Sequence, residues 1–118
     1  MYALRGAINV KDNKEEDILE ATKTLMKEIM QENKLKESDL VSIITSATDD
    51  LTKVYPGRAI REIGYNSTPI LCLQEMKVEN SSKKMIRLLV HVDGKKENNE
   101  IKHQYLKKAK KLRPDLLD

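Results

Sequence analysis

Apolar residues recur along this chain at two spacings, one typical of helices and one of strands. Between Lys14 and Glu32 they return every three or four positions, which predicts a long amphipathic helix. Asn13 and Glu16 have the spacing of a capping box, and Asn33 is a suitable C-terminal stop. The apolar positions of this predicted helix are Ile18, Ala21, Leu25, Met26, Ile29 and Met30.

Four segments have the length and composition of strands, being rich in Val, Ile and Leu and flanked by polar turns. They are Tyr2–Val10, Leu40–Thr48, Thr68–Met76 and Met85–Val92. Between the second and third of them, Pro56 opens a short helix that Gly64 ends.

The last segment fits both periodicities. Helical spacing relates Ile101, Tyr105, Leu106, Ala109 and Leu112, whereas a strand face would hold Tyr105, Lys107, Ala109 and Lys111. Local propensity favours a helix, and Arg113-Pro114 ends the segment in either case.

The length of 118 residues predicts a single domain, 1–118. With no Phe or Trp, the core must be aliphatic, which indicates that oligomerisation adds burial. One cysteine excludes an intramolecular disulfide and indicates a reducing compartment. No stretch has the pattern of a signal peptide or the length of a membrane span, so we expect a soluble, cytoplasmic protein with no membrane partner.

The net charge of +3 is compatible with an anionic small molecule or with nucleic acid. The basic stretch Lys107–Arg113 has no aromatic platform, so a solvated cationic face is favoured over a nucleic-acid site. The chain has neither a Gly-rich phosphate loop nor a Cys/His metal pattern, and we expect no metal or cofactor.

Two charges are set among strand-like apolar residues. Glu75 follows the run Ile70–Leu73, and Arg87 lies inside Met85–Val92. Because unpaired charges are rarely fully buried, the two either pair with each other or face a polar ligand. On the residues alone, an ion pair between them is favoured.

The chain contains a series of short motifs from its first strand to its last segment. They are Leu4-Arg5-Gly6-Ala7, Ser46-Ala47-Thr48, Asp50-Leu51, Tyr55-Pro56, Arg58-Ala59, Arg61-Glu62, Pro69, Cys72-Leu73-Gln74-Glu75-Met76, Lys84, Ile86-Arg87, Tyr105-Leu106 and Leu112-Arg113-Pro114-Asp115. In this order and spacing they resemble the small monofunctional chorismate mutases of the trimeric, barrel-like type. The resemblance implies an α+β fold with a mixed sheet packed against one long helix. It also implies a pseudo-barrel homotrimer with an active site at each subunit interface, and a strand at Gln104–Leu112.

The implied reaction is the Claisen rearrangement of chorismate to prephenate, in aromatic amino-acid biosynthesis. This isomerisation needs no proton transfer, covalent intermediate or cofactor. The protein must hold the substrate dianion in its reactive shape and stabilise negative charge on the ether oxygen.

The resemblance gives Arg87 the ether-oxygen contact, which suits a permanently charged fork of donors. Glu75 would accept a hydrogen bond from the ring hydroxyl of the substrate. Cys72 would contact the same hydroxyl through its backbone or its thiol, although a lone cysteine is otherwise a core residue.

Other matched positions would bind the rest of the substrate. Arg5 is the implied carboxylate partner, with Gly6 leaving room beside it, and Tyr105 adds a phenol unless it is an amphipathic core residue.

Four flanking positions complete the implied site. Arg61 would neutralise a carboxylate from the rim, and Arg58 flanks the site unless it is only a solvated charge. Tyr55 stands where the family usually has Phe against the substrate ring. Leu71 stands where Thr is often found.

The alternative is a trimeric protein of the enamine/imine deaminase type, which also binds a carboxylate with an arginine. The ordered motifs Cys72-x-x-Glu75 and Ile86-Arg87 favour the mutase instead.

Overall fold

The computed structural model describes residues 1–112 of the chain. Its helices are α1 (Glu15–Glu32) and α2 (Pro56–Glu62), and its strands are β1 (Tyr2–Asn9), β2 (Leu40–Ala47), β3 (Ile70–Gln74), β4 (Met85–Val92) and β5 (Gln104–Leu106). Three short 3-10 helices span Glu37–Asp39, Asn98–Glu100 and Lys107–Leu112. The four predicted strands and both predicted helices are therefore present, with ends that differ by at most two residues.

The strands form one five-stranded mixed sheet in the order β3-β2-β4-β1-β5. The central strand β4 is antiparallel to both β1 and β2. The edge strands β5 and β3 run parallel to β1 and β2, respectively. A parallel neighbour requires a crossover, and α2 lies in the connection from β2 to β3. This confirms the α+β architecture with a mixed sheet.

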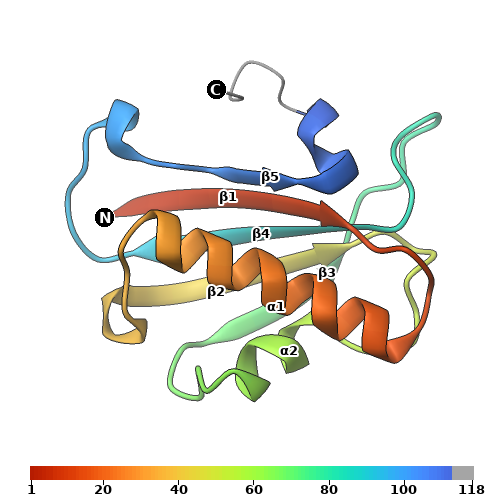
Figure 1. The fold of residues 1–118 in the computed structure, drawn as a ribbon, viewed down its shortest axis with the longest axis horizontal. Coiled ribbons are helices and arrows are strands. Elements are labelled where there is room, and N and C mark those ends of the chain that lie inside the picture. The colour runs from red at the N-terminus through yellow and green to blue at the C-terminus, as the bar shows by residue number, and fades with distance from the viewer. Residues whose placement is uncertain (113–118) are drawn as a thin grey trace.

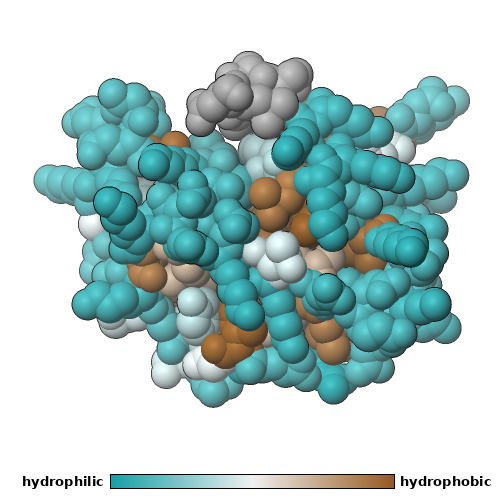
Figure 2. Space-filling model, in the orientation of Figure 1, coloured by the Kyte–Doolittle hydropathy of each residue, from teal (hydrophilic) through white to brown (hydrophobic). Residues whose placement is uncertain are grey.

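Both helices lie on the same face of the sheet (Figure 1). The six apolar positions predicted for the long helix are buried in α1, where they pack on the alternate, inward residues of the sheet such as Leu4, Ile8, Leu88 and Val90. The outer surface of this helical layer is largely hydrophilic, with small separate hydrophobic areas (Figure 2). We call the opposite face of the sheet, which α1 and α2 leave uncovered, the open face.

Gly6 permits the close approach of α1 to β1. A Cβ on Gly6 would lie 2.7 Å from Ile29 Cδ1 and 3.1 Å from Leu25 Cδ1, tighter than side chains normally pack. The idea that Gly6 leaves room for a ligand beside Arg5 was wrong, because Gly6 faces α1.

Strand β5 is much shorter than the resemblance implied. Only Gln104–Leu106 pairs with β1, and a 3-10 helix over Lys107–Leu112 follows. The turn occurs at Lys107, which has a positive φ of 53° and cannot continue a strand. Local propensity thus correctly opposed a strand as far as Leu112, while Arg113-Pro114 lies outside the described residues.

The ends of α1 differ from the predicted caps in one respect. Lys14 occupies the N-cap and makes no side-chain cap, so the capping box of Asn13 and Glu16 was wrong. The Asn13 amide instead bonds the loop before α2, donating to Thr52 Oγ1 at 3.0 Å and accepting from the Thr52 N–H at 3.0 Å. At the other end Asn33 is the C-cap, as predicted.

Within residues 1–112, no helix is both long enough and apolar enough to cross a membrane.

Candidate active site

Arg87 and Glu75 meet on the open face. Arg87 Nε lies 3.1 Å from Glu75 Oε1, and Ser46 donates a hydrogen bond of 2.9 Å to the same oxygen. Three different strand segments supply these side chains: Arg87 is in β4, Ser46 is in β2, and Glu75 follows β3. The sequence correctly placed the two charges together, but Ser46 was missed as a site residue although it belongs to one of the matched motifs.

The register of the strands places Tyr105 in the same row of the open face as Arg87, with Ala7 between them. Ala7 is the register partner of Tyr105 in β5 and of Arg87 in β4, and Arg87 in turn faces Ser46. Tyr105, Ala7, Arg87 and Ser46 thus form one row across the open face. Tyr105 is only 6% exposed, because Ala109 of the following 3-10 helix packs beside it.

A second row brings Arg5 alongside the first. Arg5 is the register partner of Leu89, Leu89 that of Ile44, and Ile44 that of Leu71. A shallow cavity of about 260 Å³ lies between the rows, lined by Arg5, Ile44, Ser46, Glu75, Arg87, Leu88 and Leu89. The predicted residues Arg5, Glu75 and Arg87 therefore share one cavity within a single chain.

Two polar atoms of this region are buried without a hydrogen-bond partner among the described residues, Arg87 Nε and Tyr105 Oη. The contact of Arg87 with Glu75 is thus a close ion pair and not an aligned hydrogen bond. Buried donors are nearly always satisfied in folded proteins, so two unsatisfied ones on the strands that flank β1 point to a missing polar partner.

Cys72 lies on the other face of the sheet. Its Sγ would be 2.9 Å from a Cβ on Gly57 of α2, so the thiol fills the space beside that glycine. Its register partner in β2 is the fully buried Thr45, which places both side chains on the helical side. Within one chain the thiol therefore points away from the cavity that holds Arg87.

A second, larger cavity of about 640 Å³ opens on the helical side. Its lining includes Tyr55 and Arg58 as well as Cys72, Leu73 and Gln74 of β3. Tyr55 is 75% exposed, and nothing in residues 1–112 covers its ring. Within one chain, Tyr55, Arg58 and Cys72 thus form a group separate from Arg5, Glu75 and Arg87.

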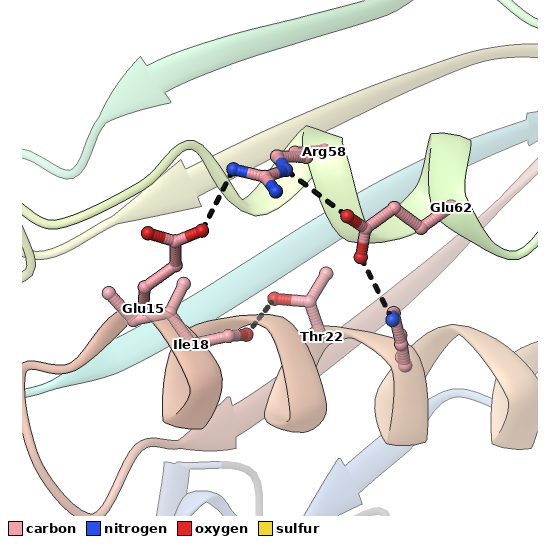
Figure 3. A network of polar contacts seen from close by, with 6 residues as sticks. Glu15, Ile18, Thr22, Arg58 and Glu62 are labelled. Atoms are coloured by element: carbon pink, nitrogen blue, oxygen red, sulfur yellow. Dashed lines mark hydrogen bonds and ion pairs between the residues drawn. The ribbon is translucent and has the colours of Figure 1, made fainter.

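Arg58 is held between two carboxylates rather than left as a free cation. It contacts Glu15 of α1 at 2.8 Å and Glu62 of its own helix at 3.1 Å (Figure 3). Glu62 also contacts Lys23 of α1 at 2.9 Å. The hydrogen bond from Lys23, followed by that from Arg58, lowers the pKa of Glu62 and outweighs the opposing effect of desolvation. Arg61, on the same helix, is exposed.

Residues 1–112 contain no cluster of three or more His, Cys, Asp or Glu side chains suited to a metal ion.

The family model described as chorismate mutase type I matches residues 1–116. The chain belongs to the chorismate mutase type I family. Chorismate mutase AroH of Bacillus subtilis (strain 168) is 43% identical over 114 residues, covering 96% of this chain and 90% of that protein. Chorismate mutase AroH of Thermus thermophilus is 34% identical over 114 residues, covering 96% and 93%, respectively.

A solved structure of a chorismate mutase from Clostridium thermocellum has the same fold. The TM-score is 0.91 at 41% identity, over 93% of this chain and 98% of that one. These relatives and the family match decide between the two families considered from the sequence, in favour of the mutase.

Proposed function

We propose that this chain is a chorismate mutase that rearranges chorismate to prephenate. The observation that carries the proposal is the family match over residues 1–116, together with relatives of that name at up to 43% identity over nearly the whole chain. The arrangement on the open face supports it, because a cavity lined by two cations and one carboxylate suits a dianionic substrate that also carries a hydroxyl.

Arg87 is proposed to stabilise the ether oxygen as the C–O bond breaks. Its buried Nε has no hydrogen-bond partner among the described residues, and a guanidinium carries further N–H donors in a fixed plane. The ion pair with Glu75 orients the guanidinium of Arg87 from one side. An oriented cation of this kind stabilises the transition state without having to reorganise during the reaction.

Glu75 is proposed to accept the hydrogen bond of the substrate's ring hydroxyl. Ser46 donates to one of its oxygens, Oε1, which leaves acceptor capacity on the carboxylate. Since the thiol of Cys72 points to the helical side, the contact proposed for Cys72 is through its backbone.

Arg5 and Tyr105 are proposed to bind substrate carboxylates. Arg5 lines the cavity, and the Tyr105 hydroxyl is buried without a hydrogen-bond partner in residues 1–112. A bound carboxylate oxygen would satisfy that donor. Burial of the ring between Ala7 and Ala109 leaves the phenol few alternative orientations.

The remaining site residues are proposed to act across a subunit interface in a homotrimer. Tyr55, Leu71, Arg58 and Arg61 lie outside the cavity of Arg87 in one chain, so a complete site needs a second copy. The N-cap of α2, the edge strand β3 and the chain after β3 also expose large apolar side chains, namely Tyr55, Leu71, Leu73, Met76 and Val78. Exposed hydrophobic patches of this kind mark interaction sites. We propose further that residues 1–118 form one domain and that the enzyme is cytoplasmic.

The test is to incubate the pure protein with chorismate and follow loss of its ultraviolet absorbance, with prephenate identified as the product. The Arg87→Ala variant, purified in the same way, controls for a contaminating mutase. Loss of chorismate with the parent protein but not with the variant is the expected result. A parent protein that leaves chorismate unchanged would refute the proposal.

A further inference from the structure

Strand β5, which carries Tyr105, is only three residues long and lies at the edge of the sheet. Such a short parallel edge strand has few backbone hydrogen bonds and is weakly held by itself. Two asparagine side chains bond the backbone on either side of it: Asn33 at Lys102 and Asn9 at Lys108.

Asn33 bonds the chain just before β5 in the manner of a neighbouring strand. Its Nδ2 donates to the carbonyl of Lys102 at 2.9 Å, and its Oδ1 accepts from the N–H of Lys102 at 3.0 Å. The same Nδ2 also donates to the carbonyl of Ile29 at 2.9 Å, at the end of α1. Asn33 is 3% exposed, so these bonds are shielded from water.

Asn9 holds the chain just after β5. Its Oδ1, at the end of β1, accepts from the N–H of Lys108 at 2.9 Å. The backbone turns sharply between β5 and Lys108, at Lys107, whose φ is 53°. On the other side of Tyr105, the N–H of Arg5 donates to His103 Nδ1 at 2.9 Å, which adds a direct bond between the segment and β1.

We propose that Asn33 and Asn9 are positioning residues that fix the Tyr105 hydroxyl on the open face, in the row that also holds Arg87. This inference rests on the proposed function, in which Tyr105 binds a substrate carboxylate. Asn33 bonds the segment to the end of α1, and Asn9 bonds it to the end of β1. Two separate elements of the fold therefore fix the position of Tyr105. Displacement of a binding group by about 1 Å can cost a hundredfold in rate, so these two amides control activity without touching substrate.

The experiment is a set of double-mutant cycles with Tyr105→Phe, which removes only the hydroxyl. Asn33→Ala and Asn9→Ala should each lower kcat/KM by about 10- to 100-fold in the parent. In the Tyr105→Phe background the same substitutions should cost much less, because the group they position is gone. Asn9→Asp retains the acceptor for the Lys108 N–H and should keep most of the activity.

Asn13→Ala is the matched control. Asn13 makes the same kind of two-bond bridge, to Thr52, but far from β5 in the sequence and in another connection. Its effect on kcat/KM should be equal in the parent and the Tyr105→Phe backgrounds. If the effects of Asn33→Ala and Asn9→Ala are also equal in both, or if Asn9→Asp loses as much as Asn9→Ala, the positioning role is overturned.

Amide hydrogen exchange tests the anchoring without measuring activity, so its result does not depend on the proposed function. Asn9→Ala provides the test if Asn33→Ala does not fold. Residues 102–108 should exchange faster in Asn9→Ala, and in Asn33→Ala where it folds, than in Asn13→Ala, with α1 still protected. Unchanged protection of residues 102–108 would overturn the anchoring. A parent protein without mutase activity would refute the proposed function, whatever the exchange shows.

Discussion

Tyr105 and Arg87 are the two register neighbours of Ala7, one on each side of β1. Each has a buried polar atom, Oη or Nε, that lacks a hydrogen-bond partner among the described residues. An unsatisfied buried donor such as the Tyr105 hydroxyl costs about 1–3 kcal/mol of stability, whereas Arg87 Nε is compensated by the Glu75 carboxylate oxygen 3.1 Å away. The substrate carboxylate proposed above to bind Tyr105 would satisfy its hydroxyl and offset this cost.

The first prediction separates charge from shape at Arg87. Citrulline at this position keeps the shape and removes the charge, so it should lower kcat by about 100- to 1,000-fold and change KM little. Arg87→Ala should be at least as damaging, and Arg87→Lys should retain part of the activity. The test is to measure kcat and KM with chorismate, and the melting temperature, for each variant.

A purely structural ion pair would give the opposite pattern. The loss of Arg87 would then lower the melting temperature, and the additional change Glu75→Gln would restore both stability and rate. A folded citrulline variant with near-normal kcat would contradict the catalytic role.

The second prediction concerns assembly. Light scattering should give a mass of three chains, and Leu73→Glu should reduce that mass and abolish activity, because it places a charge in the proposed interface at a residue that is 50% exposed in one chain. Gln31→Glu makes the same charge change on the exposed side of α1 and should alter neither. Full activity from a monomeric parent would rule out sites shared between subunits.

The third prediction concerns a buried hydroxyl in the core. Thr45 is fully buried in β2, and its Oγ1 has no hydrogen-bond partner in the described part of the chain. Thr45→Val should therefore stabilise the protein by about 1 kcal/mol, since it removes an unsatisfied polar group at nearly constant size. The midpoint of denaturant unfolding at fixed protein concentration measures this.

Thr22→Val is the control for that change. The Thr22 hydroxyl is equally buried but donates to the Ile18 carbonyl at 2.8 Å (Figure 3), so its removal should bring no gain. Equal shifts for the two variants would show that hydrogen bonding is not the cause.

The fourth prediction concerns the acid sensitivity of the link between the helices. The folded state lowers the pKa of Glu62 below its ordinary value of 4.5, mainly through the hydrogen bond from Lys23. Folding therefore favours the ionised form. The resulting stability is present above the unfolded pKa and is lost as the pH falls through the folded one.

The corresponding measurement is the melting temperature of Glu62→Gln against the parent. The variant should melt lower at about pH 7, and the difference should be smaller at a pH well below the ordinary value of 4.5, because the stability from the Glu62 carboxylate is lost as the pH falls through its lowered folded pKa. Glu20→Gln, on the exposed surface of α1, should show no such convergence. A difference that is the same at both pH values would point to a cause other than the charge of Glu62.

The fifth prediction concerns metals. The proposed rearrangement requires no metal or cofactor, so kcat should survive exhaustive dialysis against a chelator. A loss of activity that a divalent ion restores would contradict the proposed mechanism.

Local pattern by itself determined most of the elements. The periodicity of apolar residues between Ile18 and Met30 predicted α1 and its buried face, and the run Met85–Val92 predicted β4 to the residue. These predictions succeeded because burial of one face imposes its period directly on the sequence. The ordered motifs likewise sufficed to indicate the family.

The sequence could not decide which face of the sheet each site residue takes. The run Ile70–Leu73 is apolar throughout, so alternation alone does not say whether Cys72 or Leu71 points to the helices. Packing against Gly57 of α2 places Cys72 on the helical side, and Leu71 is left 57% exposed. That choice depends on residues about fifteen positions apart in the chain.

The tertiary structure also decided how β5 ends and which bonds hold it. The propensity of residues 101–112 favoured a helix, and the family resemblance favoured a strand. The chain forms three strand residues and then a 3-10 helix, because pairing with β1 stops at Leu106 and Ala109 packs beside Tyr105. The bonds from Asn33 and Asn9 join residues 69 and 99 positions apart, and no local pattern encodes contacts at such separations.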